Sequence, residues 1–120
     1  MKQKVLVTGG AGYIGSMLVP DLLQSGFAVT VVDDFRYKQN SLGHVCHYED
    51  FDVVKADVRV KEVMEPLYKK ADIIIPLAAL VGAPLCKADP ISATTINKDA
   101  VLDMLKVLSP SQCVLMPITN

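Results

Sequence analysis

The chain has 120 residues, of which 51% are hydrophobic and 21% are charged, and its formal net charge is −1. This length fits one domain, residues 1–120, and leaves no room for a separate substrate domain. The near-neutral charge offers no basic patch for nucleic acid or an anionic membrane, and no apolar run approaches the roughly 20 residues that span a bilayer.

Short apolar runs rich in β-branched residues alternate with longer stretches of helical periodicity. Strands are predicted at residues 4–8, 28–33, 51–56, 72–77 and 112–117, and their consecutive apolar positions suit strands covered on both faces. Helices are predicted at residues 12–25, 60–69 and 90–108, with a short helical turn near 40–42 in a long polar connection. This alternation indicates βαβ units on a parallel sheet and therefore the α/β fold class.

The first predicted helix carries apolar residues at helical spacing and a proline in its interior. Pro20 is expected to kink the helix rather than to break it. Gly26 is expected to end it. The face expected to be buried consists of Ile14, Met17, Leu18, Leu22 and Leu23.

Glycines gather where the first strand meets the first helix. Gly10-x-Gly12-x-x-Gly15 matches GxGxxG, and Gly9, Gly12 and Gly15 also match TGxxGxxG. Glycine permits backbone angles closed to other residues and lets the main chain approach a pyrophosphate at the positive end of the helix. The motif has its required context, namely a preceding strand, a following helix and an acidic end to the second strand. It therefore predicts a dinucleotide-binding, Rossmann-type doubly wound parallel sheet; the alternative is a glycine-rich turn without a ligand.

Asp33 ends the second predicted strand, 18 residues after Gly15, close to the spacing of about 20 that is typical of the ribose-binding acid. Its carboxylate can accept both hydroxyls of the adenosine ribose and would repel a 2′-phosphate, which favours NAD over NADP. A solvated turn aspartate is the alternative. Arg36 and Lys38 lie nearby and could in principle bind a 2′-phosphate.

The segment Thr8-Gly-Gly-Ala-Gly-Tyr-Ile-Gly15-Ser16 resembles the opening of the extended short-chain dehydrogenase/reductases, specifically the NAD-dependent sugar-nucleotide epimerases and dehydratases. The resemblance continues through residues 33–42, 55–59, 77–79 and 96–97 and so covers the whole chain in order. It implies an enzyme that oxidises a sugar hydroxyl of a nucleotide sugar by hydride transfer to bound NAD. Dimerisation is frequent in this family through helices that this chain partly lacks, so the resemblance offers a homodimer as one assembly and leaves the oligomeric state open.

The resemblance also assigns residues to the cofactor. Asp57 matches an aspartate that meets the adenine, with Val58 beside it, and Asn97 matches an asparagine near the nicotinamide half. The complete set of expected cofactor contacts is Gly9, Gly12, Tyr13, Ile14, Gly15, Asp33, Asp34, Asp57, Val58, Leu77, Ala78, Ala79 and Asn97. Without the resemblance, Asp57 could equally belong to a surface turn, and Ala78 and Ala79 could reflect tight packing.

The family's catalytic Tyr-x-x-x-Lys pair is absent from the 120 residues, because the four tyrosines are followed four positions later by Met17, Ser41, Asp52 and Asp72. In relatives this pair lies beyond the fifth strand. The resemblance therefore implies an amino-terminal portion, with the sheet truncated after the fifth strand, that lacks the base and the sugar-binding region and is inactive alone. Residues 116–120 resemble the strand end that carries a catalytic hydroxyl, so Thr119 is the catalytic candidate; a structural threonine is the alternative.

Other residue clusters give weaker signals. His44, Cys46 and His47 could bind zinc, but only three ligands cluster there, so a loop without metal is expected. The three cysteines form no CxxC pair and leave an odd count, which favours reduced thiols in the cytoplasm over a disulfide framework. A Rossmann regulator that senses NAD without chemistry is the alternative function, since it also needs no Tyr-x-x-x-Lys pair.

Overall fold

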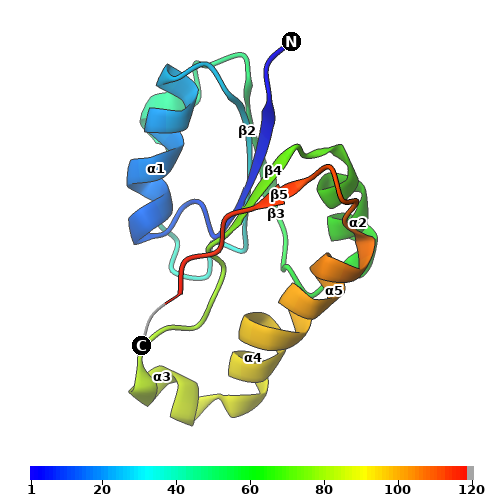
Figure 1. Ribbon diagram of the computed structural model, residues 1–120. Helices are drawn as coiled ribbons and strands as arrows, with labels where there is room; N and C mark the ends of the chain where they lie inside the picture. The colour runs from blue at the N-terminus through cyan, green and yellow to red at the C-terminus, as the bar shows by residue number, and fades with distance from the viewer. Residues whose placement is uncertain (119–120) are drawn as a thin grey trace.

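A five-stranded parallel sheet forms the centre of the computed structural model, which describes residues 1–118 (Figure 1). The strands are β1 (Lys4–Thr8), β2 (Ala28–Asp33), β3 (Phe51–Lys55), β4 (Ile73–Pro76) and β5 (Cys113–Val114). Their order is β3-β2-β1-β4-β5, and every pairing is parallel. The strand order reverses between β1 and β4, so the predicted doubly wound Rossmann-type sheet is confirmed.

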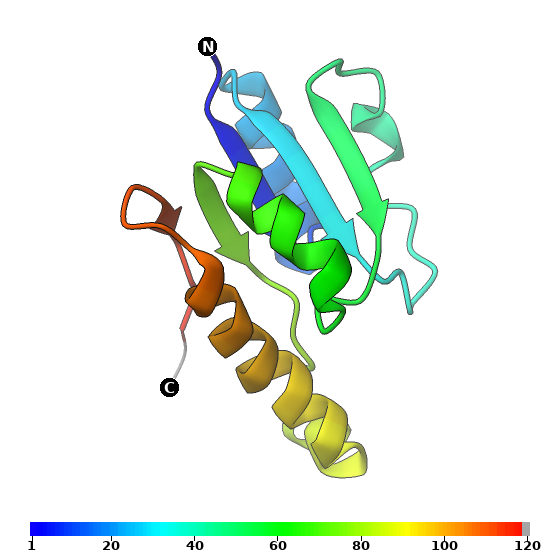
Figure 2. The ribbon, with the colours of Figure 1, turned by 90° about the vertical axis from the view of Figure 1, so that its right-hand side faces the viewer.

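Helices cover both faces of this sheet (Figures 1 and 2). One face is covered by α1 (Tyr13–Gln24), and the other by α2 (Lys61–Lys70) and α5 (Ala100–Val107). The shorter elements are the 3₁₀ turn η1 (Gly43–Val45), α3 (Ala83–Ala88), α4 (Pro90–Thr94) and the π-helical segment η2 (Thr95–Asp99). Within residues 1–118, none of these helices has the length and apolar character needed to cross a membrane.

The side chains of β1 alternate between two apolar clusters, one on each face of the sheet. Val5 and Val7 pack in the cluster beneath α1, whereas Leu6 packs with Met64 of α2 and Met104 of α5. All five side chains are at most 2% exposed. Burial on both faces explains why the strand is apolar at consecutive positions instead of alternating with polar residues.

The buried face of α1 was predicted incorrectly in part. Gly15, Val19 and Leu23 form the buried face, whereas Ile14 is 57% exposed and Met17 is 71% exposed. Gly15 sets this orientation, because its missing side chain lets the helix backbone approach the β1–α1 turn. Leucine spacing alone could not predict that a glycine forms the point of closest contact.

Other boundaries also differ from the prediction. β5 has two residues rather than six, and α3 lies between the predicted strand at 72–77 and the predicted helix at 90–108, where no helix was predicted. The turn expected near 40–42 is the η1 turn at Gly43–Val45. The predicted helix at 90–108 is helical from Pro90 to Val107, but it contains the π segment η2, which a simple apolar periodicity does not reveal.

Candidate functional site

The β1–α1 turn lies where the strand order reverses, at the carboxyl ends of β1 and β4, and its glycines permit unusually close packing. Gly9 has a φ of +68°, and a Cβ there would lie 2.7 Å from the Ala78 nitrogen. A Cβ on Gly15 would lie 2.5 Å from the Gly10 carbonyl carbon, and one on Gly10 would lie 2.7 Å from the Val31 side chain. These three glycines are therefore required by packing within the fold itself.

Gly12 differs from the other three glycines of this turn. A Cβ there would meet only the Gly9 carbonyl oxygen, at 3.2 Å. Gly12 is the N-cap of α1 in an ordinary extended conformation, with φ −78° and ψ −169°, and no side chain caps the helix. The contact with the Gly9 oxygen is tight, but a shift of a few tenths of an ångström would relieve it, so packing of the described residues accounts for a glycine less strongly here than at Gly9, Gly10 and Gly15.

The first turn of α1, which follows Gly12, has positive polarity. It contains no acidic residue, and the described residues provide no hydrogen-bond acceptor for the amides of Tyr13 and Ile14. Tyr13 is 92% exposed. Unpaired amides and the helix dipole together favour an anion at this position.

Asp33 ties the glycine turn to the end of β2. It is 8% exposed; its Oδ2 accepts a hydrogen bond from the Ala11 amide at 3.1 Å, and its Oδ1 accepts one from the Phe35 amide at 2.8 Å. The Ser41 hydroxyl donates to the Ala11 carbonyl at 2.7 Å, which adds a second tie. Each carboxylate oxygen can accept more than one hydrogen bond, so both oxygens of Asp33 retain the capacity to accept a ligand hydroxyl.

Asp34 points its carboxylate at a neighbouring cation. Its Oδ2 lies 2.9 Å from Nε and 2.7 Å from Nη2 of Arg36, and its Oδ1 accepts the Arg36 amide at 3.1 Å. The side-chain hydrogen bond to Asp34 is the largest cause of a raised pKa for Arg36. Asp34 is therefore paired within its own loop.

Asp57 and Val58 lie in the β3–α2 connection, where Arg59 contacts the aspartate. Arg59 Nε lies 2.9 Å from Asp57 Oδ1, and Nη2 lies 2.6 Å from Oδ2. These hydrogen bonds lower the pKa of Asp57 and raise the pKa of Arg59. Arg59 Nη1 also reaches the hydroxyl oxygens of Ser92 at 3.4 Å and Thr95 at 3.2 Å. Arg59 was not among the predicted site residues, although its position two residues after Asp57 is visible in the sequence.

The end of β4 is fixed against β1 and against the π segment. The Leu77 amide donates to the Thr8 carbonyl at 2.9 Å, and the Ala78 amide donates to Thr8 Oγ1 at 3.4 Å. Asn97, within η2, accepts the Leu80 amide at 2.8 Å and donates to the Leu80 carbonyl at 2.9 Å. Leu77 and Ala78 are half-buried and Ala79 is exposed. Asn97 thus holds the chain that follows these three residues.

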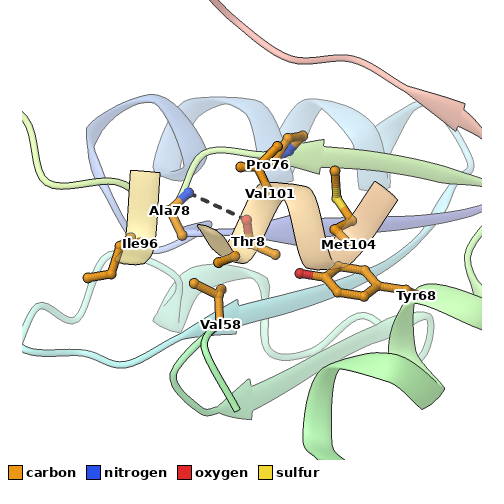
Figure 3. Close-up of a pocket in the computed structure, with 9 residues that line it drawn as sticks. Thr8, Val58, Tyr68, Pro76, Ala78, Ile96, Val101 and Met104 are labelled. Atoms are coloured by element: carbon orange, nitrogen blue, oxygen red, sulfur yellow. Dashed lines mark hydrogen bonds between the residues drawn. The ribbon is translucent and has the colours of Figure 1, made fainter. Parts of the chain in front are cut away.

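A small apolar cavity lies between the carboxyl end of β1 and the long helical segment (Figure 3). Val58 and Ala78 both line it, so two predicted cofactor contacts from different connections meet there. Tyr68 lines its far side, and burial, with a smaller effect of the Asp103 charge, raises the pKa of Tyr68 to about 12. The Tyr68 phenol is therefore neutral at physiological pH.

Two further predictions concern the catalytic threonine and a metal site. Thr119 is outside the described residues. No group of three or more potential metal ligands occurs in residues 1–118, including the segment with His44, Cys46 and His47. There the Cys46 thiol donates to the Leu42 carbonyl at 3.4 Å, and the His47 ring stacks obliquely on Tyr48 with centroids 4.5 Å apart.

Comparison with known proteins gives matches along nearly the whole chain. The model of the NAD dependent epimerase/dehydratase family matches residues 5–116. UDP-glucuronic acid decarboxylase 1 of Danio rerio is 35% identical over 105 residues, which are 87% of this chain and 24% of that protein. UDP-glucose 4-epimerase of Bos taurus is 28% identical over 124 residues and is matched over 34% of its length by 90% of this chain. The chain thus spans about a quarter to a third of the length of these relatives.

Solved structures show the same relationship in three dimensions. The UDP-glucose 4-epimerase of Thermus thermophilus in complex with NAD superposes with a TM-score of 0.74 at 29% identity, covering 88% of this chain and 33% of that one. The UDP-glucose-4-epimerase of Stenotrophomonas maltophila with bound NAD superposes with a TM-score of 0.81 at 28% identity, covering 95% and 36%. In each case about a third of the solved chain corresponds to this one.

Proposed function

Because the chain belongs to the NAD dependent epimerase/dehydratase family, we propose that residues 1–120 form the NAD-binding Rossmann domain of a sugar-nucleotide epimerase or dehydratase. The observation that carries this proposal is that Gly12 is the least crowded glycine of a turn whose other glycines are closed by packing. A ligand backbone that approaches Gly12 explains the missing side chain, and the amides beyond it supply the hydrogen-bond donors that a pyrophosphate needs.

The adenosine half of NAD is assigned to the ends of β2 and β3. In this proposal the Asp33 carboxylate accepts the ribose hydroxyls while it holds the turn through the Ala11 amide. Asp57 and Val58 contact the adenine, and the Arg59 pairing keeps Asp57 ionised as a hydrogen-bond acceptor. The nicotinamide half extends along Leu77, Ala78 and Ala79 toward Asn97.

The chemistry that NAD supplies when bound is acceptance of a hydride at its nicotinamide ring. Oxidation of the sugar hydroxyl would also require a general base to take the hydroxyl proton. No Tyr-x-x-x-Lys pair occurs in the 120 residues, so we assign the base to residues outside this sequence. Thr119 is assigned the hydrogen bond to the reacting sugar oxygen. This chain contributes the binding and orientation of the cofactor.

The proposed substrate is a nucleotide sugar, because the names of the two relatives given above, UDP-glucuronic acid decarboxylase 1 and UDP-glucose 4-epimerase, state UDP-linked sugars as their substrates. The proposed compartment is the cytoplasm, since Cys46, Cys86 and Cys113 are free thiols. A homodimer is the proposed assembly, the one that the resemblance offers.

Titration calorimetry with NAD and NADP tests the proposal, in parallel with an activity assay on a protein that extends this chain. Tight binding of NAD, weaker binding of NADP and turnover of a UDP-sugar by the extended protein are expected. Tight binding of NAD without turnover of any nucleotide sugar would favour an NAD-sensing regulator. Absence of NAD binding by a folded chain would refute both functions.

A further inference from the structure

The loop after β2 holds a potential phosphate-binding cation in an ion pair. Arg36 directs Nε and Nη2, the two donors along one edge of its guanidinium, at Asp34 Oδ2, at 2.9 and 2.7 Å. Both side chains are about one-third exposed, so the pair lies at the surface beside the buried Asp33. The pair is therefore within the loop that follows the proposed ribose-binding carboxylate.

The backbone of this loop holds Arg36 in place. Phe35 and Lys38 have positive φ values of 53° and 54°, a conformation that non-glycine residues rarely adopt. The Phe35 amide donates to Asp33, and the Lys38 amide donates to the Phe35 carbonyl at 2.9 Å. Strained residues of this kind persist only where their surroundings impose them, and they cluster at ligand-binding sites.

The chemistry of the pair bears on the choice between two dinucleotides. In Rossmann domains an arginine near the end of the second strand accommodates the 2′-phosphate of NADP. Such recognition uses a fork of two guanidinium donors on two phosphate oxygens. In this chain Nε of Arg36 donates to Asp34 Oδ2 at 2.9 Å, and Nη2 lies 2.7 Å from the same oxygen in the ion pair. Arg59, the neighbouring arginine at this edge, is likewise paired, with Asp57.

We propose that Asp34 is a specificity-determining residue, which excludes NADP by occupying the guanidinium of Arg36 that would otherwise bind the 2′-phosphate. The inference rests on the proposed NAD-binding function and adds to it a second source of selectivity, separate from repulsion by Asp33. It predicts that the effect of Asp34 on the NAD-to-NADP preference depends on the presence of Arg36.

A double-mutant cycle on the 120-residue chain tests this dependence. The variants are Asp34→Asn, Arg36→Gln and the double variant, and the dissociation constants of NAD and NADP are measured for each by calorimetry. Asparagine keeps an oxygen that can accept the Arg36 amide but removes the charge. Circular dichroism of each variant serves as the folding control.

Asp34→Asn is expected to reduce the preference for NAD over NADP by about tenfold, the scale of one charge-assisted hydrogen bond. Arg36→Gln alone is expected to leave the preference nearly unchanged. The double variant is expected to lack the gain in NADP affinity that Asp34→Asn shows. A gain of the same size without Arg36 would show that Asp34 acts by its own charge, which overturns the inference. So would an unchanged preference in Asp34→Asn.

The two proposals fail in different ways. Unchanged NAD binding by every variant, with an unaltered preference, overturns only the role of Asp34. Failure of the unsubstituted, folded chain to bind NAD overturns the proposed function and this inference with it.

Discussion

Gly12 and Gly15 stand three residues apart in one motif, yet their substitution is expected to have opposite consequences. A Cβ on Gly12 meets only the Gly9 carbonyl oxygen at 3.2 Å, whereas a Cβ on Gly15 lies 2.5 Å from the Gly10 carbonyl carbon. Gly12→Val is therefore expected to fold and to lose NAD, and Gly15→Ala is expected to destabilise the fold.

The magnitudes follow from these contacts. At the N-cap, replacement of glycine by an apolar residue costs on the order of 1 kcal/mol of unfolding free energy. In a helix interior, Gly→Ala would ordinarily stabilise by about 0.5–1 kcal/mol. The overlap with the Gly10 backbone reverses that sign, because overpacking costs about 1–3 kcal/mol and more when backbone must move.

The loss of NAD affinity can also be estimated. A valine side chain at Gly12 would separate the pyrophosphate from the amides of Tyr13 and Ile14. Each hydrogen bond to a charged group contributes about 1.5–3 kcal/mol, so loss of two raises the dissociation constant by about a hundredfold or more.

Thermal unfolding and calorimetric titration of both variants check these expectations. Gly26→Ala is the control: Gly26 lies outside the site with a φ of +90°, so this variant should lose stability but keep its affinity for NAD. Wild-type affinity for NAD in Gly12→Val would refute the assigned position of the pyrophosphate. A Gly15→Ala variant as stable as the unsubstituted chain would refute the packing argument.

Three further substitutions extend the account. Asp33→Ala should weaken NAD binding about tenfold or more and lower the unfolding free energy by about 1–3 kcal/mol, because the amides of Ala11 and Phe35 lose their acceptor; equal affinity of the unsubstituted chain for NAD and NADP would contradict the role of Asp33. Because the folded-state pKa of Tyr68 is about 12, above its ordinary value near 10, the unfolded chain releases this proton first. The contribution of Tyr68 to the free energy of unfolding should therefore be fully present below pH 10, and the free energy of unfolding should fall by up to about 2 kcal/mol toward pH 12. Tyr68→Phe should remove that fall, as chemical denaturation across this pH range would show. The 120-residue chain should not turn over UDP-glucose, since general acid–base catalysis typically contributes about 10²–10⁴-fold. In an extended protein, Thr119→Val should lower turnover with NAD affinity nearly intact; an unchanged rate would remove Thr119 from the mechanism.

Much of the fold was predictable because the sheet is buried on both faces. Consecutive apolar residues in β1 and β2 define strands whose bounds agree with the structure, Lys4–Thr8 and Ala28–Asp33. The fifth strand was less predictable. β5 pairs only with β4 among the described residues, and its partner register covers two positions, Cys113 and Val114. Apolar composition does not reveal where a strand leaves its single partner.

The candidate site was predictable where glycine spacing and an acidic strand end carry the signal. The sequence could not reveal that Asp33 also binds the Ala11 amide, because this contact depends on tertiary structure. The same holds for Asn97, whose amide group meets the Leu80 backbone across 17 positions of the chain. Long-range side-chain contacts with backbone atoms have no local pattern.

Titration of a ¹⁵N-labelled chain with NAD, followed by NMR of the backbone amides, tests the central claim most directly. The account predicts that the largest shifts occur at Gly12, Tyr13 and Ile14, with further shifts at the ends of β2 and β4. The groove at the amino edge of the sheet, lined by Thr30 and Asp52, should show none. Shifts confined to that groove, with the β1–α1 turn unaffected, would contradict the proposed NAD site.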